Sequence, residues 1–175
     1  MSLSKNLLCL TINRTNSTQM MLRHWKNKQN VSLCAKYQSK GIGQGRNSWE
    51  SGEGGLYYSI KLHNSVPVHV DSKMIAEMVQ KEIKKISNIN TTIKPPNDIY
   101  YNGKKLAGVL VESEVTLSAS TTDVSIIGVG ININQEKFSE GLNAIAICQL
   151  IKTKQDLTTY RMALDKLFSS SFISD

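Results

Sequence analysis

The amino-acid sequence predicts an α/β or α+β domain in which helices pack on a mixed β-sheet. Three observations support this fold class. Segments with apolar residues at helical spacing alternate along the chain with short runs of β-branched and aromatic residues. An Asn-Gly pair between two such runs is typical of a tight antiparallel hairpin. The 175 residues fit one domain and can bury a sizeable core.

The first part of the chain is predicted to hold one helix and two strands. Residues 15–17 can cap a helix and precede an apolar cluster, which places the helix start near Thr18. Residues 31–37 alternate loosely between apolar and polar side chains, as a half-buried strand does. Residues 56–62 are rich in aromatic and β-branched side chains and are also strand-like. Two glycine-rich segments between these strands, residues 41–49 and 52–55, are expected to be loops.

Two longer helices are predicted further along the chain. Asp71 or Ser72 caps the first of them, whose apolar residues recur at spacings of four, four and three. These residues are Ile75, Val79, Ile83 and Ile86. The last helix is predicted from a similar apolar stripe near the end of the chain. That stripe consists of Leu157, Tyr160, Leu164, Leu167 and Phe168.

A β-hairpin and two further strands are predicted between these helices. Residues 91–94 form a short strand that ends at two prolines. Residues 99–101 and 105–112 form the hairpin, because Asn102-Gly103 tolerates the two positive φ angles of a type I′ turn. Residues 124–129 form an apolar strand.

The composition indicates a soluble domain with a mildly basic surface. The net charge is +7, which suggests an anionic partner, but the lysines are scattered and are not interleaved with aromatic residues. Helix-turn-helix and zinc-finger spacings are absent from the sequence, so no nucleic-acid partner is expected. No apolar run approaches the roughly 20 residues that span a bilayer, and no secretory signal is recognisable. We therefore expect a cytoplasmic protein without a membrane partner.

The cysteines and histidines do not predict a metal site. Cys9, Cys34 and Cys148 are odd in number and far apart, which argues against a disulfide framework and against zinc. The three histidines are not grouped at a metal-ligand spacing either. We expect the cysteines to be buried and unreactive.

The first segment that could bind a ligand or take part in a reaction is the glycine-rich loop, which follows Gln38 and spans residues 41–49. Gly41, Gly43 and Gly45 let backbone N–H groups approach an anion closely, because no Cβ intervenes. Their spacing matches neither a P-loop nor a dinucleotide fingerprint. From the residues alone, the loop is either an anion-binding segment or a flexible surface loop.

The second segment combines residues 94–99 with the strand 105–112. Two prolines fix the approach to Asn97 and Asp98, whose amide and carboxylate can orient a cation or a nucleotide. Strand alternation predicts Lys105 and Ala107 on one face of the sheet, with Leu106 and Gly108 on the other. A half-buried lysine next to a glycine suits a phosphate or carboxylate clamp. A lysine whose stem lies along the surface is the alternative, and we assign that role to Lys104.

The third segment is a strand that ends in a glycine-rich turn, residues 128–134, with Gly128, Gly130, Asn132 and Asn134. Glycines at a strand end permit close approach of a ligand, and they also occur at bulges.

In this order, the three segments resemble the biotin protein ligase family. That family has a GRGRxGRxW-type loop, a KWPNDL-type segment, a KLAGIL[VIL]E strand and a GxGINxN-type turn, which match residues 41–49, 94–99, 105–112 and 128–134 here. Residues 15–17, which follow residues 12–14, resemble the family's DSTN segment before the first helix. The resemblance covers about residues 8–135, and the PND and KLAG segments are its most specific part.

The resemblance implies a fold and an activity. The fold is a mixed, largely antiparallel sheet packed by helices, similar to that of class II aminoacyl-tRNA synthetases. The activity is ATP-dependent conversion of biotin to biotinyl-5′-AMP and its transfer to a lysine of a biotin carboxyl carrier protein, with Mg²⁺ as the ion. We expect residues 1–175 to be the catalytic domain, without an N-terminal DNA-binding domain and without the family's small C-terminal β-domain. Homodimers, usually formed through sheet edges, are common in the family.

The resemblance also implies site residues. Lys105 matches the catalytic lysine that contacts the biotin carboxylate and the α-phosphate. The positions implied to bind biotin are Thr15, Asn16, Gln38, Gly41, Ile42, Gly43, Lys105, Gly108, Gly128 and Gly130. The positions implied to bind the nucleotide are Gln44, Arg46, Trp49, Asn97, Lys105 and Asn132. Asp98 is the candidate magnesium ligand.

Three positions depart from the family pattern. Ile42 stands where the family has an arginine, Arg14 replaces a small residue, and Pro95 replaces the tryptophan of the KWPND segment. Isoleucine cannot neutralise a carboxylate, so Arg46 is a second candidate catalytic residue, whose guanidinium would reach the phosphate from within the loop.

Two other functions remain open at the level of sequence. Lipoate–protein ligases share the fold and a related adenylation, but they are expected to lack PND followed by KLAG. A ligand-binding homologue with reduced ligase activity is the other alternative, because Ile42 removes a positive charge from the loop. A DNA-binding repressor is not expected, because only about ten residues precede the resemblance.

Overall fold

The computed structural model describes residues 7–45, 47–63, 65–115 and 120–173. Seven strands form one sheet in the order β1-β2-β3-β7-β6-β5-β4. The β1–β2 pair is parallel and every other neighbouring pair is antiparallel, which confirms the mixed, largely antiparallel sheet. The strands are β1 (Leu7–Thr15), β2 (Asn30–Gln38), β3 (Leu56–His63), β4 (Thr92–Lys94), β5 (Asp98–Tyr101), β6 (Lys104–Glu114) and β7 (Val124–Ile131).

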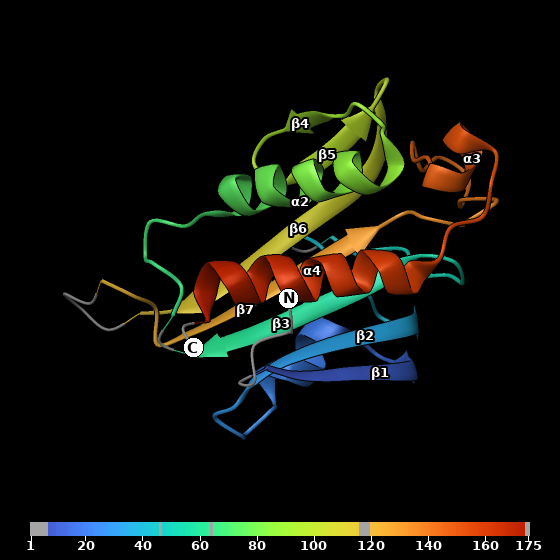
Figure 1. Ribbon diagram of the computed structural model, residues 1–175. Coiled ribbons are helices and arrows are strands. Elements are labelled where there is room, and N and C mark those ends of the chain that lie inside the picture. The colour runs from blue at the N-terminus through green and yellow to red at the C-terminus, as the bar shows by residue number, and fades with distance from the viewer. Residues whose placement is uncertain (1–6, 46, 64, 116–119, 174–175) are drawn as a thin grey trace.

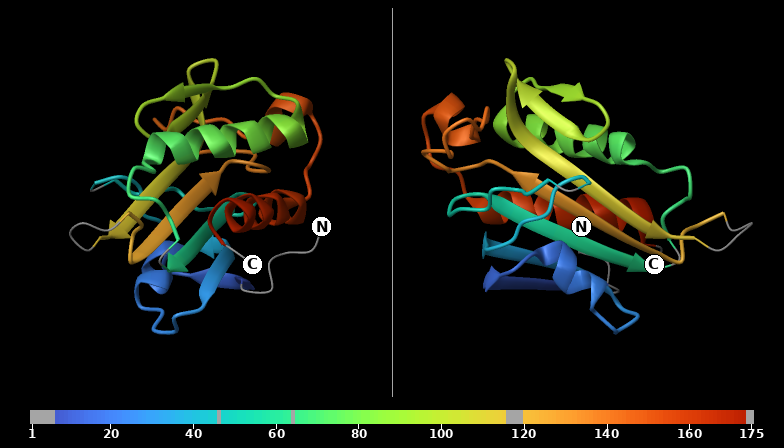
Figure 2. Two further views of the ribbon diagram at one scale, coloured as in Figure 1. Left: turned by 60° about the vertical axis from the view of Figure 1, so that its left-hand side comes forward. Right: turned by 180° about the vertical axis from the view of Figure 1, so that it is seen from behind.

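The helices lie on both faces of this sheet. The two long helices pack on one face (Figure 1), while α1 and the glycine-rich loop lie on the opposite face, seen from behind in Figure 2. The helices are α1 (Thr18–Arg23), α2 (Ser72–Ser87), α3 (Ile147–Ile151) and α4 (Leu157–Phe172). None of the described helices is long and apolar enough to cross a membrane.

Two apolar clusters hold these layers together. The larger lies between the sheet and the long helices and includes Ile75 and Val79 of α2 and Leu164 and Phe168 of α4. The smaller lies under α1, where Leu22 packs on side chains of β2 and β7. Burial of each such side chain contributes on the order of 2 kcal/mol, so packing against the sheet fixes the helices in place.

The predicted helices and hairpin are confirmed. Ser17 and Asp71 cap α1 and α2, each accepting a hydrogen bond from a backbone N–H three residues on. Asn102 and Gly103 have φ angles of 45° and 77°, as the type I′ turn requires. The prediction did not include β1 or the short helix α3.

The predicted alternation along β6 is wrong. Ile99 pairs with Ala107 but Tyr100 pairs with Lys105, so Leu106 is an extra residue and the strand has a bulge there. The bulge reverses the alternation, and the Lys105 side chain therefore lies on the same face as Gly108. A Cβ added at Gly108 would lie 3.4 Å from Cε of Lys105.

The cysteines are only partly as predicted. Cys34 is buried, and this burial raises the pKa of its thiol to about 11. Cys9 and Cys148 are half-buried, and burial also raises the pKa of Cys9. Thiols that stay protonated at neutral pH are poor nucleophiles, in keeping with a structural role for Cys9 and Cys34.

Candidate functional site

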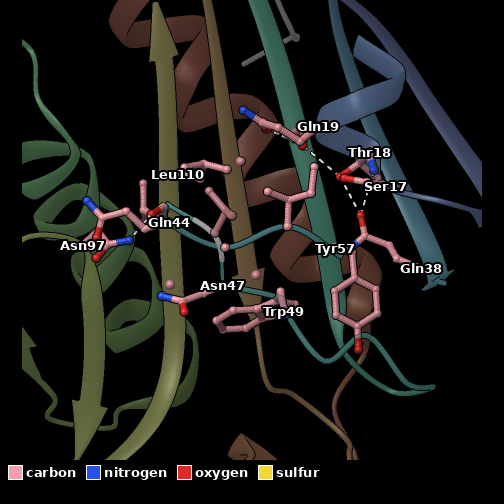
Figure 3. Close-up of a pocket in the computed structure, with 18 of the residues that line it drawn as sticks. Ser17, Thr18, Gln19, Gln38, Gln44, Asn47, Trp49, Tyr57, Asn97 and Leu110 are labelled. Atoms are coloured by element: carbon pink, nitrogen blue, oxygen red, sulfur yellow. Dashed lines mark hydrogen bonds between the residues drawn. The ribbon is translucent and has the colours of Figure 1, made fainter. Parts of the chain in front are cut away.

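The three segments singled out in the sequence meet in one cavity on the face that carries α1 (Figure 3). One wall comes from the start of α1 and from β3, and the floor comes from β6 and β7. The glycine-rich loop covers the floor. The predicted site residues among those that line this cavity are Gln38, Ile42, Gly43, Gln44, Trp49, Asn97, Asp98, Lys105, Gly108, Gly128 and Gly130.

One end of the cavity is polar and consists of Thr18, Gln19, Gln38 and Ser59, which we call the polar end. The backbone N–H and the hydroxyl of Thr18 donate to Oε1 of Gln38, at 2.7 and 3.1 Å. The hydroxyls of Thr18 and Ser59 lie 2.8 Å apart, and Ser59 donates to Oε1 of Gln19 at 3.1 Å. All four side chains are buried, so these hydrogen bonds offset the cost of removing them from water.

Thr15 and Asn16 lie outside the cavity, contrary to the prediction. Thr15 directs its hydroxyl toward Sδ of Met21, and Asn16 accepts a hydrogen bond from Ser39 at 2.8 Å. Ser17, Thr18 and Gln19 line the cavity in their place. This position could have been predicted from the sequence, because residues 16–19, Asn-Ser-Thr-Gln, align with the DSTN pattern and share its Ser-Thr pair.

The glycine-rich loop folds back on itself over the cavity. Gly43 N–H donates to the Asn47 carbonyl at 2.8 Å, and Trp49 N–H donates to the Gly41 carbonyl at 2.9 Å. Gly41 is buried and is not among the residues that line the cavity. A Cβ at this position would collide with the Trp49 carbonyl, so the turn requires a glycine there. The candidate residue Arg46 lies outside the described residues.

Trp49 lies flat against the glycines of the floor. A Cβ added at Gly130 would stand 2.5 Å from Cε2 of the indole, and one at Gly108 would stand 2.9 Å from Cζ3. Both glycines are therefore required by close approach of the ring, which explains their place in β6 and β7. The indole N–H is buried and has no hydrogen-bond partner among the described residues.

The contact between Trp49 and Gly130 can be tested by tryptophan fluorescence. A Gly130→Val variant in a Trp25→Phe background should push the indole off the floor, and its emission maximum should shift to longer wavelength as the ring meets water. Gly52→Val is the control, because a Cβ at Gly52 has no neighbour within 4 Å. An unchanged emission maximum in Gly130→Val would contradict the placement of Trp49.

Lys105 is the cation that faces this cavity among the described lining residues. Its Nζ lies 2.8 Å from Oδ1 of Asp98 and 5.1 Å from the centroid of the Trp49 ring. Both side chains of the ion pair are mostly buried, with 28% and 21% of their surface exposed. A cation held between a carboxylate and an aromatic face is positioned before any ligand arrives.

Two asparagines fix the backbone around Lys105. Asn97 donates from its amide to the Val109 carbonyl at 2.6 Å, which ties the start of β5 to β6. Asn132 donates to the carbonyl of Lys105 itself, at 3.1 Å. Asn97 lines the cavity, whereas Asn132 lies behind it, so Asn132 supports the lysine instead of facing a nucleotide.

The cavity offers few side chains that could hold a magnesium ion. Within the described ranges, no group of three or more His, Cys, Asp or Glu side chains is arranged to hold a metal. Asp98 is the single carboxylate among the residues that line the cavity, and it is paired with Lys105. Magnesium commonly keeps most of its waters and binds through one carboxylate and substrate phosphates. The site therefore fits an ion that arrives with a nucleotide, with Asp98 as its one protein ligand.

Several lining residues were not predicted from the sequence. Ser59 and Tyr57 come from β3, and Leu110 comes from β6, all as part of ordinary strands. Asn47 and Ser48 belong to the glycine-rich loop itself. Ser59 carried the clearest signal, because a small hydroxyl-bearing side chain interrupts the run of apolar and aromatic residues from Leu56 to Ile60.

Comparisons with known proteins point to one family. The family model described as "Biotin/lipoate A/B protein ligase family" matches residues 10–132. The "Bifunctional ligase/repressor BirA" of Bacillus spizizenii is 33% identical over 141 residues, which are 77% of this chain and 43% of that protein. "Biotin--protein ligase 1, chloroplastic" of Arabidopsis thaliana is 32% identical in an alignment of 170 residues that covers 89% of this chain and 46% of that protein. The chain thus spans less than half the length of these curated relatives.

Solved structures agree with the fold. The biotin protein ligase from Aquifex aeolicus in complex with biotin and ATP superposes with a TM-score of 0.80 at 29% identity, covering 95% of this chain and 70% of that one. P. falciparum LipL1 in complex with lipoate superposes with a TM-score of 0.59 at 13% identity, covering 94% of this chain and 62% of that one. The second likeness concerns the fold alone.

Proposed function

Because the chain belongs to the biotin/lipoate A/B protein ligase family, we propose that it is the catalytic domain of a biotin–protein ligase. It joins biotin to ATP as biotinyl-5′-AMP and transfers the biotinyl group to a lysine of a biotin carboxyl carrier protein. The Bacillus spizizenii relative is named as a ligase, the Arabidopsis thaliana relative is named as a biotin–protein ligase, and the Aquifex aeolicus structure holds biotin and ATP. We further propose that the protein acts in the cytoplasm, without nucleic acid or membrane as partner, and that it forms a homodimer.

The polar end of the cavity is the observation that carries this proposal. Biotin ends in a ureido ring with two N–H donors and one carbonyl acceptor, whereas the lipoate ring is a dithiolane without such groups. Thr18, Gln38 and Ser59 gather donors and acceptors at one buried point of the cavity. A ureido ring can exchange hydrogen bonds with these groups, each worth about 0.5–1.5 kcal/mol, whereas a dithiolane offers them no donor and only weak sulfur acceptors. The polar end therefore favours biotin.

Lys105 is the proposed cation for the first reaction step. A biotin carboxylate oxygen attacks the α-phosphorus of ATP, the bond to the bridging oxygen breaks, and pyrophosphate leaves. Two anions have to meet, so neutralising and positioning them supplies most of the catalysis. We assign this role to the Lys105 ammonium, which Asp98 holds in place. A magnesium ion brought by ATP would add positive charge on the phosphates.

The second step requires protection of the mixed anhydride from water. The lysine amine of the acceptor attacks the biotinyl carbonyl, AMP leaves, and the amine proton passes to solvent. Until the acceptor arrives, Trp49 and the turn of the glycine-rich loop shield the cavity in which the adenylate would lie. Exclusion of water by such a cover suppresses hydrolysis of the intermediate.

A ligand-binding homologue with reduced ligase activity is the second candidate function. The observation in its favour is the charge of the described part of the loop, since Ile42, Gln44 and Asn47 face the cavity without contributing a cation. Adenylate formation would then depend on Lys105 alone among the described lining residues. Measurement of the adenylate separates the two functions.

Two threonines test the assignment of the polar end. Thr18→Val should weaken biotin binding about tenfold, because it removes one hydrogen-bonding hydroxyl from a buried site. Thr15→Val should change it less than about twofold, since this residue lies outside the cavity. Titration calorimetry of both variants with biotin and with lipoate is the measurement. A larger effect of Thr15→Val than of Thr18→Val would restore the position first predicted from the sequence.

A further inference from the structure

The helix α1, which contributes Thr18 and Gln19 to the polar end, is too short to be stable on its own. α1 has six residues, and isolated helices of this length are unstable in water because forming the first turn is costly. Its position therefore depends on contacts with the sheet. Leu22 packs in the smaller apolar cluster, and Gln19 donates to the Ile126 carbonyl of β7 at 3.2 Å. A third contact, an ion pair, joins its last residue to β6.

This ion pair between Arg23 and Glu112 has two parallel hydrogen bonds. Nε of Arg23 donates to one carboxylate oxygen at 2.7 Å, and Nη2 donates to the other at 2.6 Å. The fork geometry matches the two oxygens and fixes the orientation of both side chains. Exposed fractions of 43% and 30% leave the pair half in solvent, so its contribution is modest and depends on salt.

The ion pair continues the wall of the cavity. Gln19 and Arg23 are four residues apart and share one side of α1. Leu110 and Glu112 are two residues apart and share one face of β6. The cavity lies between Gln19 and Leu110, with Gly128 of β7 as floor, so Arg23 and Glu112 span the same gap one helical turn further on.

We propose that the Arg23–Glu112 pair is a latch that holds α1 over β7 and sets how long a ligand stays at the polar end. Both are positioning residues, since neither lines the cavity. The inference rests on the proposed function for the identity of the ligand, which is biotin. Loss of the latch lets α1 move away from β7, so biotin dissociates faster. Lys105 and Asp98, which pair with each other on β6 and β5, keep their geometry.

Single substitutions of the latch are the first part of the test. Arg23→Gln and Glu112→Gln should each raise the Kd for biotin about three- to fivefold, through a faster dissociation rate. The Kd for ATP and the adenylation rate at saturating biotin should stay at the parental values. Lys85→Gln is the matched control, because it breaks an exposed ion pair with Glu82 on α2, which packs on the opposite face of the sheet.

The charge-reversed pair Arg23→Glu with Glu112→Arg is the second part. It should bring the Kd for biotin back to within about twofold of the parental value, because the attraction is restored. Equal Kd values for Arg23→Gln, Lys85→Gln and the parent would overturn the latch. So would a failure of the reversed pair to rescue, or a loss of ATP binding as large as that of biotin. A parental chain that binds no biotin at all would instead overturn the proposed function.

Discussion

Replacing Lys105 by alanine should lower the rate of biotinyl-adenylate formation by about 10²–10³-fold, which corresponds to roughly 2–4 kcal/mol of transition-state stabilisation. The reason is the charge that accumulates when a carboxylate approaches the α-phosphate. Among the described residues that line the cavity, no other cation is available to neutralise it. Pre-steady-state release of pyrophosphate in the presence of saturating biotin and ATP measures this step.

The neighbouring lysine gives a matched control for this prediction. Lys104 is exposed and does not line the cavity, so Lys104→Ala should leave the rate within about twofold of the parent. The fold should survive in both variants, since Asp98 keeps access to water when its partner is removed. An adenylation rate in Lys105→Ala equal to that in Lys104→Ala would show that Lys105 is not the catalytic cation.

Replacing Asp165 by alanine should destabilise the protein by about 3–5 kcal/mol, the usual cost of breaking a buried ion pair from one side. Asp165 of α4 is fully buried. It accepts a hydrogen bond from the Tyr58 hydroxyl at 3.0 Å, and its other oxygen lies 3.5 Å from Nη1 of Arg161. Without the carboxylate, the tyrosine hydroxyl and the guanidinium lose their buried partner and α4 loses its polar anchor on β3.

Urea unfolding followed by circular dichroism checks this second prediction. Lys166→Ala is the control, because Lys166 is next to Asp165 in α4 but is exposed, and its effect should stay within about 0.5 kcal/mol. Asp165→Ala should still bind biotin under conditions in which it is folded, since Asp165 packs on the face of the sheet opposite the cavity. Equal unfolding free energies for the two variants would show that the buried pair does not anchor α4.

The regular elements of the fold could be predicted because local signals agree with the tertiary structure. Apolar spacing and a capping carboxylate at Asp71 define α2, and Asn102-Gly103 defines the hairpin. The prediction did not include β1, although its Leu8, Leu10 and Ile12 alternate and pack under α1. The strand lies at the edge of the sheet and pairs in parallel with β2, so no turn signal marks it.

The bulge in β6 could not be predicted from alternation alone. A period of two assigns each side chain to a face only while the register with the neighbouring strand is unbroken. The shift between Ile99 and Tyr100 is set by pairing with β5, and nothing within β6 itself announces it. This one irregularity places Lys105 on the same face as Gly108 and therefore in the cavity.

The candidate site was predictable in its motifs but not in all of its contacts. The glycine-rich loop, Lys105 and the two glycines of β7 meet in one cavity, as their resemblance to one family implies. The threonine of the polar end was predicted three residues too early in the chain, because Thr15 and Thr18 lie close together at the entry to α1. The pairing of Asp98 with Lys105 joins two strands, and sequence separation gives no sign of it.

Formation of biotinyl-5′-AMP by this chain is the most direct test of the proposed function. Purified protein should be incubated with ATP labelled at the α-phosphate and with biotin, lipoate or neither, and the acid-labile adduct should be separated chromatographically. The account predicts a labelled adduct with biotin, formed with an equal amount of pyrophosphate and absent with lipoate. Tight binding of biotin without any adduct would contradict it and would establish the ligand-binding homologue instead.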